Sequence, residues 1–253
     1  MSAEASERSV LVEGRTQSYL LIRRHGRRRL TLSVEPRRGL VVSAPSRLAL
    51  RDIEAFIVGE AAWWGSRLVE LAAWEAEHPP RAFTSGERLL LLGEAWTLRV
   101  SEEPGRQRPR VTREPRGAEP GAIALVLPAG LAPAARRELA AACLGRWYRR
   151  LAGELIAARA AHWAADLRVT PAAISIRDTR SRWGSCSGSG RLSFSWKLAM
   201  APPAVLDYLV VHELCHLRHP DHSERFWALV ASRLPDYDRA RRWLRRRGRE
   251  LYL

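Results

Sequence analysis

The stretch that most constrains this chain is VVHELCHLRHPDH, which runs from Val210 to His222. His212 and His216 are four residues apart, so on an α-helix both side chains leave the same face one turn apart and can bind one metal ion. Glu213 follows His212 directly and can reach a water molecule at the metal without being a ligand itself. The spacing therefore predicts a helix that carries a metal site suited to hydrolysis.

Two later histidines compete for the place of third ligand. His219 lies seven residues after His212, a rise of about 10 Å along a straight helix, which is too far for one tetrahedral site. Pro220 and Asp221 should end the helix and let the chain turn back, so we expect His222 to complete the site. The spacing equals that of metzincin proteases, but His219 stands where those enzymes have glycine and no Met-turn follows. The sequence leaves three roles open for His219: a neighbour of the metal ligands, a group that faces the substrate, or a surface residue.

The composition is that of a globular protein. The 253 residues are 46% apolar and include ten tryptophans, which is enough for one large domain or two small ones. The net charge is +15, and all but one of the 42 basic residues are arginine. These arginines are spread along the chain and form no recognisable nucleic-acid-binding motif, so we expect no specific nucleic-acid binding.

The cysteines and the apolar runs indicate a cytoplasmic protein outside the membrane. Cys143, Cys186 and Cys215 form no pairing pattern, and the first ten residues contain no apolar segment of the kind found in signal peptides. The longest apolar runs fall well short of the ~20 residues that a membrane span requires.

The order of patterns along the chain predicts two regions. Residues 1–15 are polar and expected to be frayed. Residues 16–128 form a β-rich N-terminal region with one long helix over 46–77, while 102–121 is rich in proline, glycine and arginine and predicts a loop. Residues 133–253 are expected to form a catalytic domain of several helices and a short β-hairpin.

The segment from Ser181 to Trp227 joins four motifs: an RWGSCS hairpin, a strand ending in tryptophan, a YLVVHELCH helix and an HSERFW segment. This combination resembles the YgjP-like metallopeptidase family, with weaker similarity over about 19–243. The resemblance implies an α+β fold, with a zincin-like catalytic domain of helices and a small antiparallel sheet. It also implies one zinc ion per chain bound by His212, His216 and His222, with Glu213 as the catalytic base. Ser195 departs from the family, which commonly has asparagine there.

The residues and the resemblance together predict a zinc-dependent metallopeptidase that acts on a peptide or protein substrate. Its reaction would be hydrolysis of the peptide bond by metal-activated water, with Glu213 as general base. The residues expected to contact the substrate or the transition state are Arg180, Arg182, Trp183 and His219.

Two other functions are consistent with the sequence. Arg177, Arg180, Arg182 and Lys197 lie near one another in the chain and suit phosphate, which would fit metal-dependent hydrolysis of a phosphoanhydride such as a nucleoside triphosphate, although there is no P-loop. The other alternative is a non-catalytic binding module with a structural zinc ion, but such a site has no use for Glu213.

Overall fold

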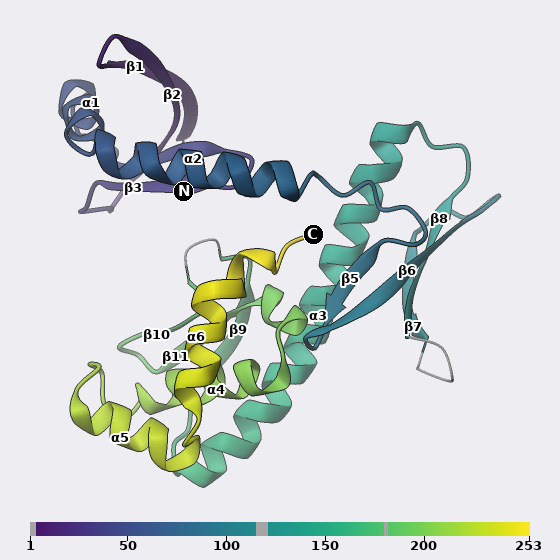
Figure 1. Ribbon diagram of the computed structural model, residues 1–253. Coiled ribbons are helices and arrows are strands. Elements are labelled where there is room, and N and C mark those ends of the chain that lie inside the picture. Colours follow the sequence, from purple (N-terminus) through teal and green to yellow (C-terminus); the bar gives the residue numbers. More distant parts are fainter. Residues whose placement is uncertain (1–3, 115–120, 180–181) are drawn as a thin grey trace. The chain divides into compact units, whose positions relative to one another are not determined.

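The computed structural model describes residues 4–114, 121–179 and 182–253 (Figure 1). By their contacts the residues group into two compact units, Met1–Pro80 and Arg81–Leu253. Both units combine helices with small sheets. The chain is therefore an α+β protein with a β-rich N-terminal region, as predicted.

The first unit is a four-stranded sheet with two helices. Its elements are β1 (Glu4–Val12), β2 (Arg15–Arg24), β3 (Thr31–Glu35), β4 (Gly39–Pro45), α1 (Leu50–Gly59) and α2 (Ala61–Glu77). The strand order is β1-β2-β4-β3, and β2 and β4 are parallel. Leu21 and Val42 of the sheet and Ile53 and Ile57 of α1 are buried in one cluster, so this unit has a hydrophobic core of its own.

Strand β1 shows that the prediction of frayed residues over 1–15 was wrong for Glu4–Val12, while residues 1–3 lie outside the described part of the chain. The strand pairs with β2 from Glu4 opposite Arg23 to Val12 opposite Arg15. Most of its residues are exposed and only Val12 is buried, so its sequence lacks the regular alternation from which strands are predicted.

The helical segment predicted over 46–77 is two helices. Glu60 separates them with a φ of −100° and a ψ of 17°, outside the helical range. Its N–H still donates to the Phe56 carbonyl, and its own carbonyl accepts from the Trp64 N–H. The interruption is one residue long, which is too short to disturb the periodicity of the apolar side chains.

The second unit begins with another four-stranded sheet. Its strands are β5 (Arg88–Leu91), β6 (Glu94–Glu103), β7 (Arg110–Glu114) and β8 (Ala122–Pro128), in the order β5-β6-β8-β7. The loop predicted over 102–121 is interrupted by β7, an edge strand. Only Val111 of β7 is buried, so the strand gives no periodic signal in the sequence.

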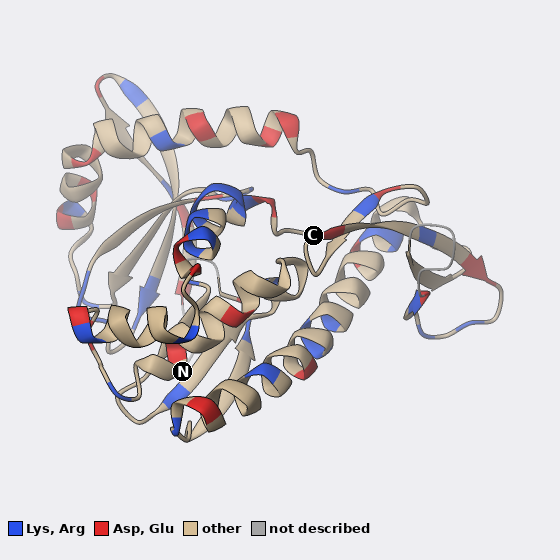
Figure 2. Cartoon of the chain, turned by 60° about the horizontal axis from the view of Figure 1, so that its bottom comes forward, with Lys and Arg blue, Asp and Glu red and all other residues tan. Residues whose placement is uncertain are grey.

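Helix α3 (Pro133–Leu167) follows this sheet and is the first of the helices expected beyond residue 133. Leu144, Tyr148 and Ile156 are fully buried along one side, while basic positions recur along the helix (Figure 2). The expected domain boundary at 128–133 lies inside the second unit, just before α3. Among the residues that the structure describes, no helix is both long and apolar enough to cross a membrane.

The rest of the second unit is a small mixed sheet followed by helices. The strands are β9 (Ala173–Arg177), β10 (Gly184–Cys186) and β11 (Arg191–Ser195), in the order β10-β11-β9. The helical elements are η1 (Trp196–Met200), α4 (Pro203–Cys215), α5 (Glu224–Arg233), α6 (Tyr237–Arg247) and η2 (Gly248–Glu250). Helix α4 packs against α3, α5, α6 and β10. It is the central helix of this unit, and it carries the histidine motif.

Candidate metal centre

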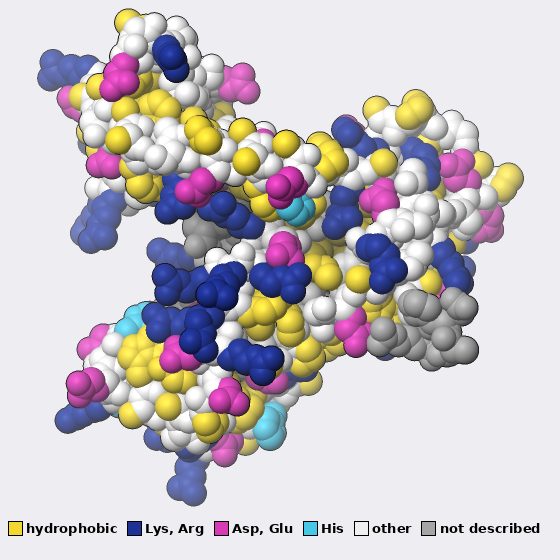
Figure 3. All heavy atoms as spheres, viewed as in Figure 1, with side chains coloured by type: hydrophobic (Ala, Val, Ile, Leu, Met, Phe, Trp, Pro, Cys, Tyr) yellow, Lys and Arg dark blue, Asp and Glu magenta, His cyan; other side chains and the backbone are white. Residues whose placement is uncertain are grey.

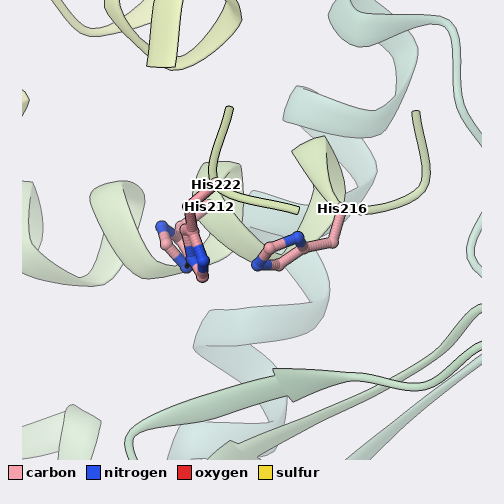
Figure 4. Close-up of side chains that lie close together, drawn as sticks. All are labelled: His212, His216 and His222. Carbon is pink, nitrogen blue, oxygen red and sulfur yellow. Dashed lines mark hydrogen bonds between the residues drawn. The ribbon is translucent and has the colours of Figure 1, made fainter. Parts of the chain in front are cut away.

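Three histidine side chains converge at the end of α4. His212, His216 and His222 each offer a ring nitrogen, and these nitrogens all lie within 4.8 Å of one another. The Nε2 atoms of His212 and His222 are 3.1 Å apart. Figure 4 shows the three imidazole rings drawn together, two from the helix end and one from the segment that follows it. The described residues contain no other such group of three.

The local backbone explains how the third histidine reaches the other two. Helix α4 ends at Cys215, and the Leu217 N–H donates to the Leu214 carbonyl, which tightens the last turn. The chain then leaves the helix axis before Pro220, earlier than the sequence suggests. His222 thereby returns toward the face from which His212 projects.

A backbone carbonyl orients one of the rings. His216 Nδ1–H donates to the carbonyl oxygen of His219 at 3.1 Å, which leaves the Nε2 lone pair of His216 available for a metal. The side chain of His219 is outside the three-histidine group. His219 therefore acts on the site through its backbone in this structure.

Burial keeps the two helix-borne imidazoles neutral. It lowers the pKa of His212 to about 3, with help from the neighbouring His216 and His222, and it also lowers the pKa of His216. A metal ligand must present a lone pair, so a neutral imidazole is the required form. Lone pairs that face each other at 3.1 Å repel unless a proton or a cation lies between them. The group thus fits a bound cation.

Two aromatic side chains of α5 form a wall around the histidines. Phe226 is fully buried, and its ring centroid lies 4.6 to 4.9 Å from those of all three imidazoles. The Trp227 ring stacks on His222 with centroids 5.6 Å apart and an interplanar angle of 26°. The sequence shows both residues in the HSERFW segment but gives them no role at the site. Their place four and five residues after His222 in the sequence is the signal that could have indicated it.

Glu213 lies on the same helix in a buried position next to β10. It is only 4% exposed, and burial raises the pKa of its carboxyl to about 7, while the positive charge of Arg182 acts in the opposite direction. A Cβ atom added to Gly184 would overlap the carboxylate and come within 2.8 Å of Glu213 Cγ. The backbone of β10 therefore passes directly over the carboxyl group.

The remaining residues singled out from the sequence fall into different places. Arg180 lies outside the described residues. Arg182 is exposed and near enough to Glu213 to affect its pKa, and Trp183 lines a pocket together with Glu213. Cys215 is fully buried and is not part of the three-histidine group.

Two aspartates that lie near the histidines in sequence have other hydrogen-bond partners. Asp207 accepts from Trp163 Nε1 at 3.0 Å and lies 3.2 Å from Arg159 Nε, on the side of α4 that faces α3. Asp221 is exposed and accepts from the Ser223 N–H at 3.4 Å. Of the basic residues that suit phosphate, Arg177 donates to Ser175 Oγ.

The fold and the site define an α+β protein with a three-histidine group that can hold a metal ion, next to a buried glutamate. Residues 28–247 match the family described as YgjP-like, metallopeptidase domain. The chain belongs to the YgjP-like metallopeptidase family, as its sequence motifs indicated. No curated protein and no solved structure matches the chain.

Proposed function

We propose that this protein is a zinc-dependent peptidase whose catalytic domain is the region 133–253. The observation that carries the proposal is that three imidazoles converge beside the carboxyl group of Glu213, which is buried on α4. Membership of a metallopeptidase family agrees with it.

His212, His216 and His222 would hold the zinc ion, one per chain. Three nitrogen ligands with a remaining open position are typical of catalytic zinc, whereas structural zinc sites are closed by four protein ligands. When bound, zinc supplies a Lewis acid that polarises the scissile carbonyl and lowers the pKa of a water molecule. The hydrogen bond from His216 to the His219 carbonyl supports this assignment, because such partners orient the ligands of metal sites.

Glu213 would act as the general base and then as the general acid. Its pKa of about 7 results mainly from burial, and a cation bound nearby would favour the carboxylate form. The carboxylate accepts the proton of the attacking water and passes it to the nitrogen of the leaving amine. Arg182, whose positive charge acts on Glu213, would support negative charge that develops in the transition state.

Strand β10 would align the peptide substrate. The carbonyl of Trp183 accepts from the Ser195 N–H, and the Ser187 N–H donates to the Arg191 carbonyl. The backbone groups of Trp183 and Ser187 therefore point toward β11. Because hydrogen-bonding directions alternate along an antiparallel pair, Gly184 and Cys186 direct their backbone groups to the open edge of the sheet. An extended peptide can pair with such an edge, next to Glu213.

The test is a comparison of the zinc-loaded wild type with Glu213→Gln on a peptide library and a panel of nucleoside triphosphates. We expect about one zinc ion per chain in both proteins and peptide hydrolysis slowed about a hundredfold or more in the variant. Unchanged peptide turnover in Glu213→Gln would rule out the assigned base. Hydrolysis of nucleoside triphosphates without peptide cleavage would favour the phosphoanhydride alternative.

A further inference from the structure

A pocket of about 280 Å³ opens beside His212 and Glu213. Its walls come from α4, from α6 and from the residues at the start of β10. Its volume is near the lower end of the range of about 300 to 1,000 Å³ that is usual for ligand pockets, which leaves room for an amino-acid side chain. Its position next to the proposed base makes it a candidate for substrate selection.

Part of the pocket lining is aromatic or aliphatic. Tyr208, Leu209 and Leu244 line it and are each less than a tenth exposed. Trp183 forms another wall, and a Cβ atom added to Gly248 would lie 2.8 Å from its Cζ2 atom. The glycine at the end of α6 thus lets the indole pack closely against the backbone. This close packing means that the wall exists before any ligand binds.

Two arginines stand at the rim of the pocket. Arg241 and Arg245 are four residues apart on α6, so they project from the same face of the helix one turn apart. Arg241 lies over the Trp227 ring at 4.7 Å and reaches Asp238 only at 3.9 Å, in an exposed pair that compensates little charge. Arg245 has no acidic partner among the described residues.

The surroundings add to this positive charge. Helix α6 has six arginines and one aspartate, and Figure 3 shows Lys and Arg side chains gathered over it. Two like charges at i and i+4 disfavour each other unless an anion lies between them. The two guanidinium groups therefore suit a negatively charged group, while the aromatic and aliphatic lining suits the carbon chain that carries it.

We propose that this pocket is a specificity subsite that binds an acidic residue of the peptide substrate beside the scissile bond, with glutamate preferred. The proposal rests on the proposed peptidase function. The guanidinium groups of Arg241 and Arg245 form charge-assisted hydrogen bonds with the carboxylate, and the side-chain methylenes lie against Trp183 and Leu244. A free carboxylate at the peptide C-terminus has the same chemistry, so the experiment must distinguish the two sources.

The experiment compares kcat/KM for three versions of one peptide. The first has an internal Glu and blocked termini, the second has Gln in its place, and the third has Gln and a free C-terminal carboxylate. In wild type we expect the Glu peptide to be cleaved about tenfold or more faster than the blocked Gln peptide. A preference for the third peptide alone would overturn the side-chain assignment.

The variants are Arg241→Gln/Arg245→Gln and, as a matched control, Arg242→Gln/Arg246→Gln. Both pairs remove two charges at the same spacing from α6, but Arg242 and Arg246 do not line the pocket. The Glu/Gln ratio should fall to about one in the first variant and be retained in the control. Equal loss in both variants would show a general effect of charge and overturn the subsite.

Because Arg241 also contacts Trp227, zinc content is measured for every variant, and Arg245→Gln is tested alone. Arg245→Glu should shift the preference from Glu toward Lys, which a loss of folding cannot produce.

Binding to catalytically inactive Glu213→Gln separates this proposal from the proposed function. If no peptide is cleaved but the Glu peptide binds Glu213→Gln more tightly than the Gln peptide, and Arg245→Gln removes the difference, the subsite stands and the peptidase function fails. If peptides are cleaved without regard to Glu, the function stands and the subsite fails.

Discussion

Gly184 and Glu213 lie so close together that position 184 has no room for a side chain. A Cβ atom there would overlap the Glu213 carboxyl group. The backbone torsions of Gly184 do not require glycine, since its φ is outside the positive range. Space alone excludes larger residues, and the strand that we propose to align the substrate is thereby held against the proposed base.

Replacement of Gly184 by alanine should therefore reduce catalysis without removing the metal. The methyl group would displace the Glu213 carboxyl, and misplacement of a catalytic group by about 1 Å can slow a reaction about a hundredfold. We expect a fall of this order in kcat/KM on peptides, with the zinc content unchanged.

The matched control is Gly188→Ala in the same hairpin. A Cβ at Gly188 meets no atom within 4 Å, and its φ is not positive. This variant should retain wild-type turnover. Normal activity in Gly184→Ala would show that Glu213 has more freedom than its burial indicates, and zinc loss in that variant would assign the glycine to the metal site instead.

The choice between His222 and His219 is tested by metal content. The nitrogen of His222 is 3.1 Å from that of His212, whereas the His219 side chain is outside the group. His222→Ala should lower zinc affinity by a factor of at least ~10, while His219→Ala should retain zinc because its backbone carbonyl remains. Zinc titration with a chromogenic chelator measures both. The reverse result would make His219 the third ligand.

Local periodicity explains which parts of this site could be predicted. His212 and His216 share a helix face because of their spacing, and the proline after His219 indicates that the chain must turn. The structure brings His222 to the helix pair, in agreement with that reasoning, while its role as a ligand stays a prediction. Each of these inferences depends on residues within about one helical turn or one loop of each other.

The parts that could not be predicted join distant segments. The overlap between Gly184 and Glu213 and the packing of Trp183 on Gly248 depend on how β10 and α6 meet α4. The paired arginines of α6 look in the sequence like a solvated basic face. Strands β1 and β7 were missed for another reason: each pairs through its backbone at a sheet edge without a buried apolar face.

Trp227 is predicted to stabilise metal binding without being a ligand. Its ring stacks on His222, and the guanidinium of Arg241 covers it at 4.7 Å. His222 is exposed and lies outside any helix, so this stacking restricts its orientation. Trp227→Leu should lower zinc affinity by roughly 10-fold, the scale of effects from residues that orient ligands.

Isothermal titration with zinc measures this effect directly. Trp63→Leu is the control, because Trp63 belongs to the first unit and is 44% exposed. Equal zinc affinity in the wild type and Trp227→Leu would show that the stacked tryptophan contributes only to packing and not to metal binding.

The stability of the metal-free protein should depend on pH through Glu213. Burial raises the pKa of this carboxyl from 4.5 to about 7, so between these values the folded state binds more protons than the unfolded state. The stabilising contribution is present below about pH 4.5 and is lost as the pH rises through about 7. Glutamine does not titrate, so Glu213→Gln should gain stability relative to wild type as the pH increases. The gain should reach at most about 3 kcal/mol.

Urea unfolding of EDTA-treated proteins between pH 5 and 8 measures this pH dependence. The control is Glu224→Gln, which changes an exposed residue of α5. A constant difference in the free energy of unfolding between wild type and Glu213→Gln across this range would mean that the carboxyl group titrates at its ordinary pKa. Its burial would then not prepare it to exchange a proton near neutral pH.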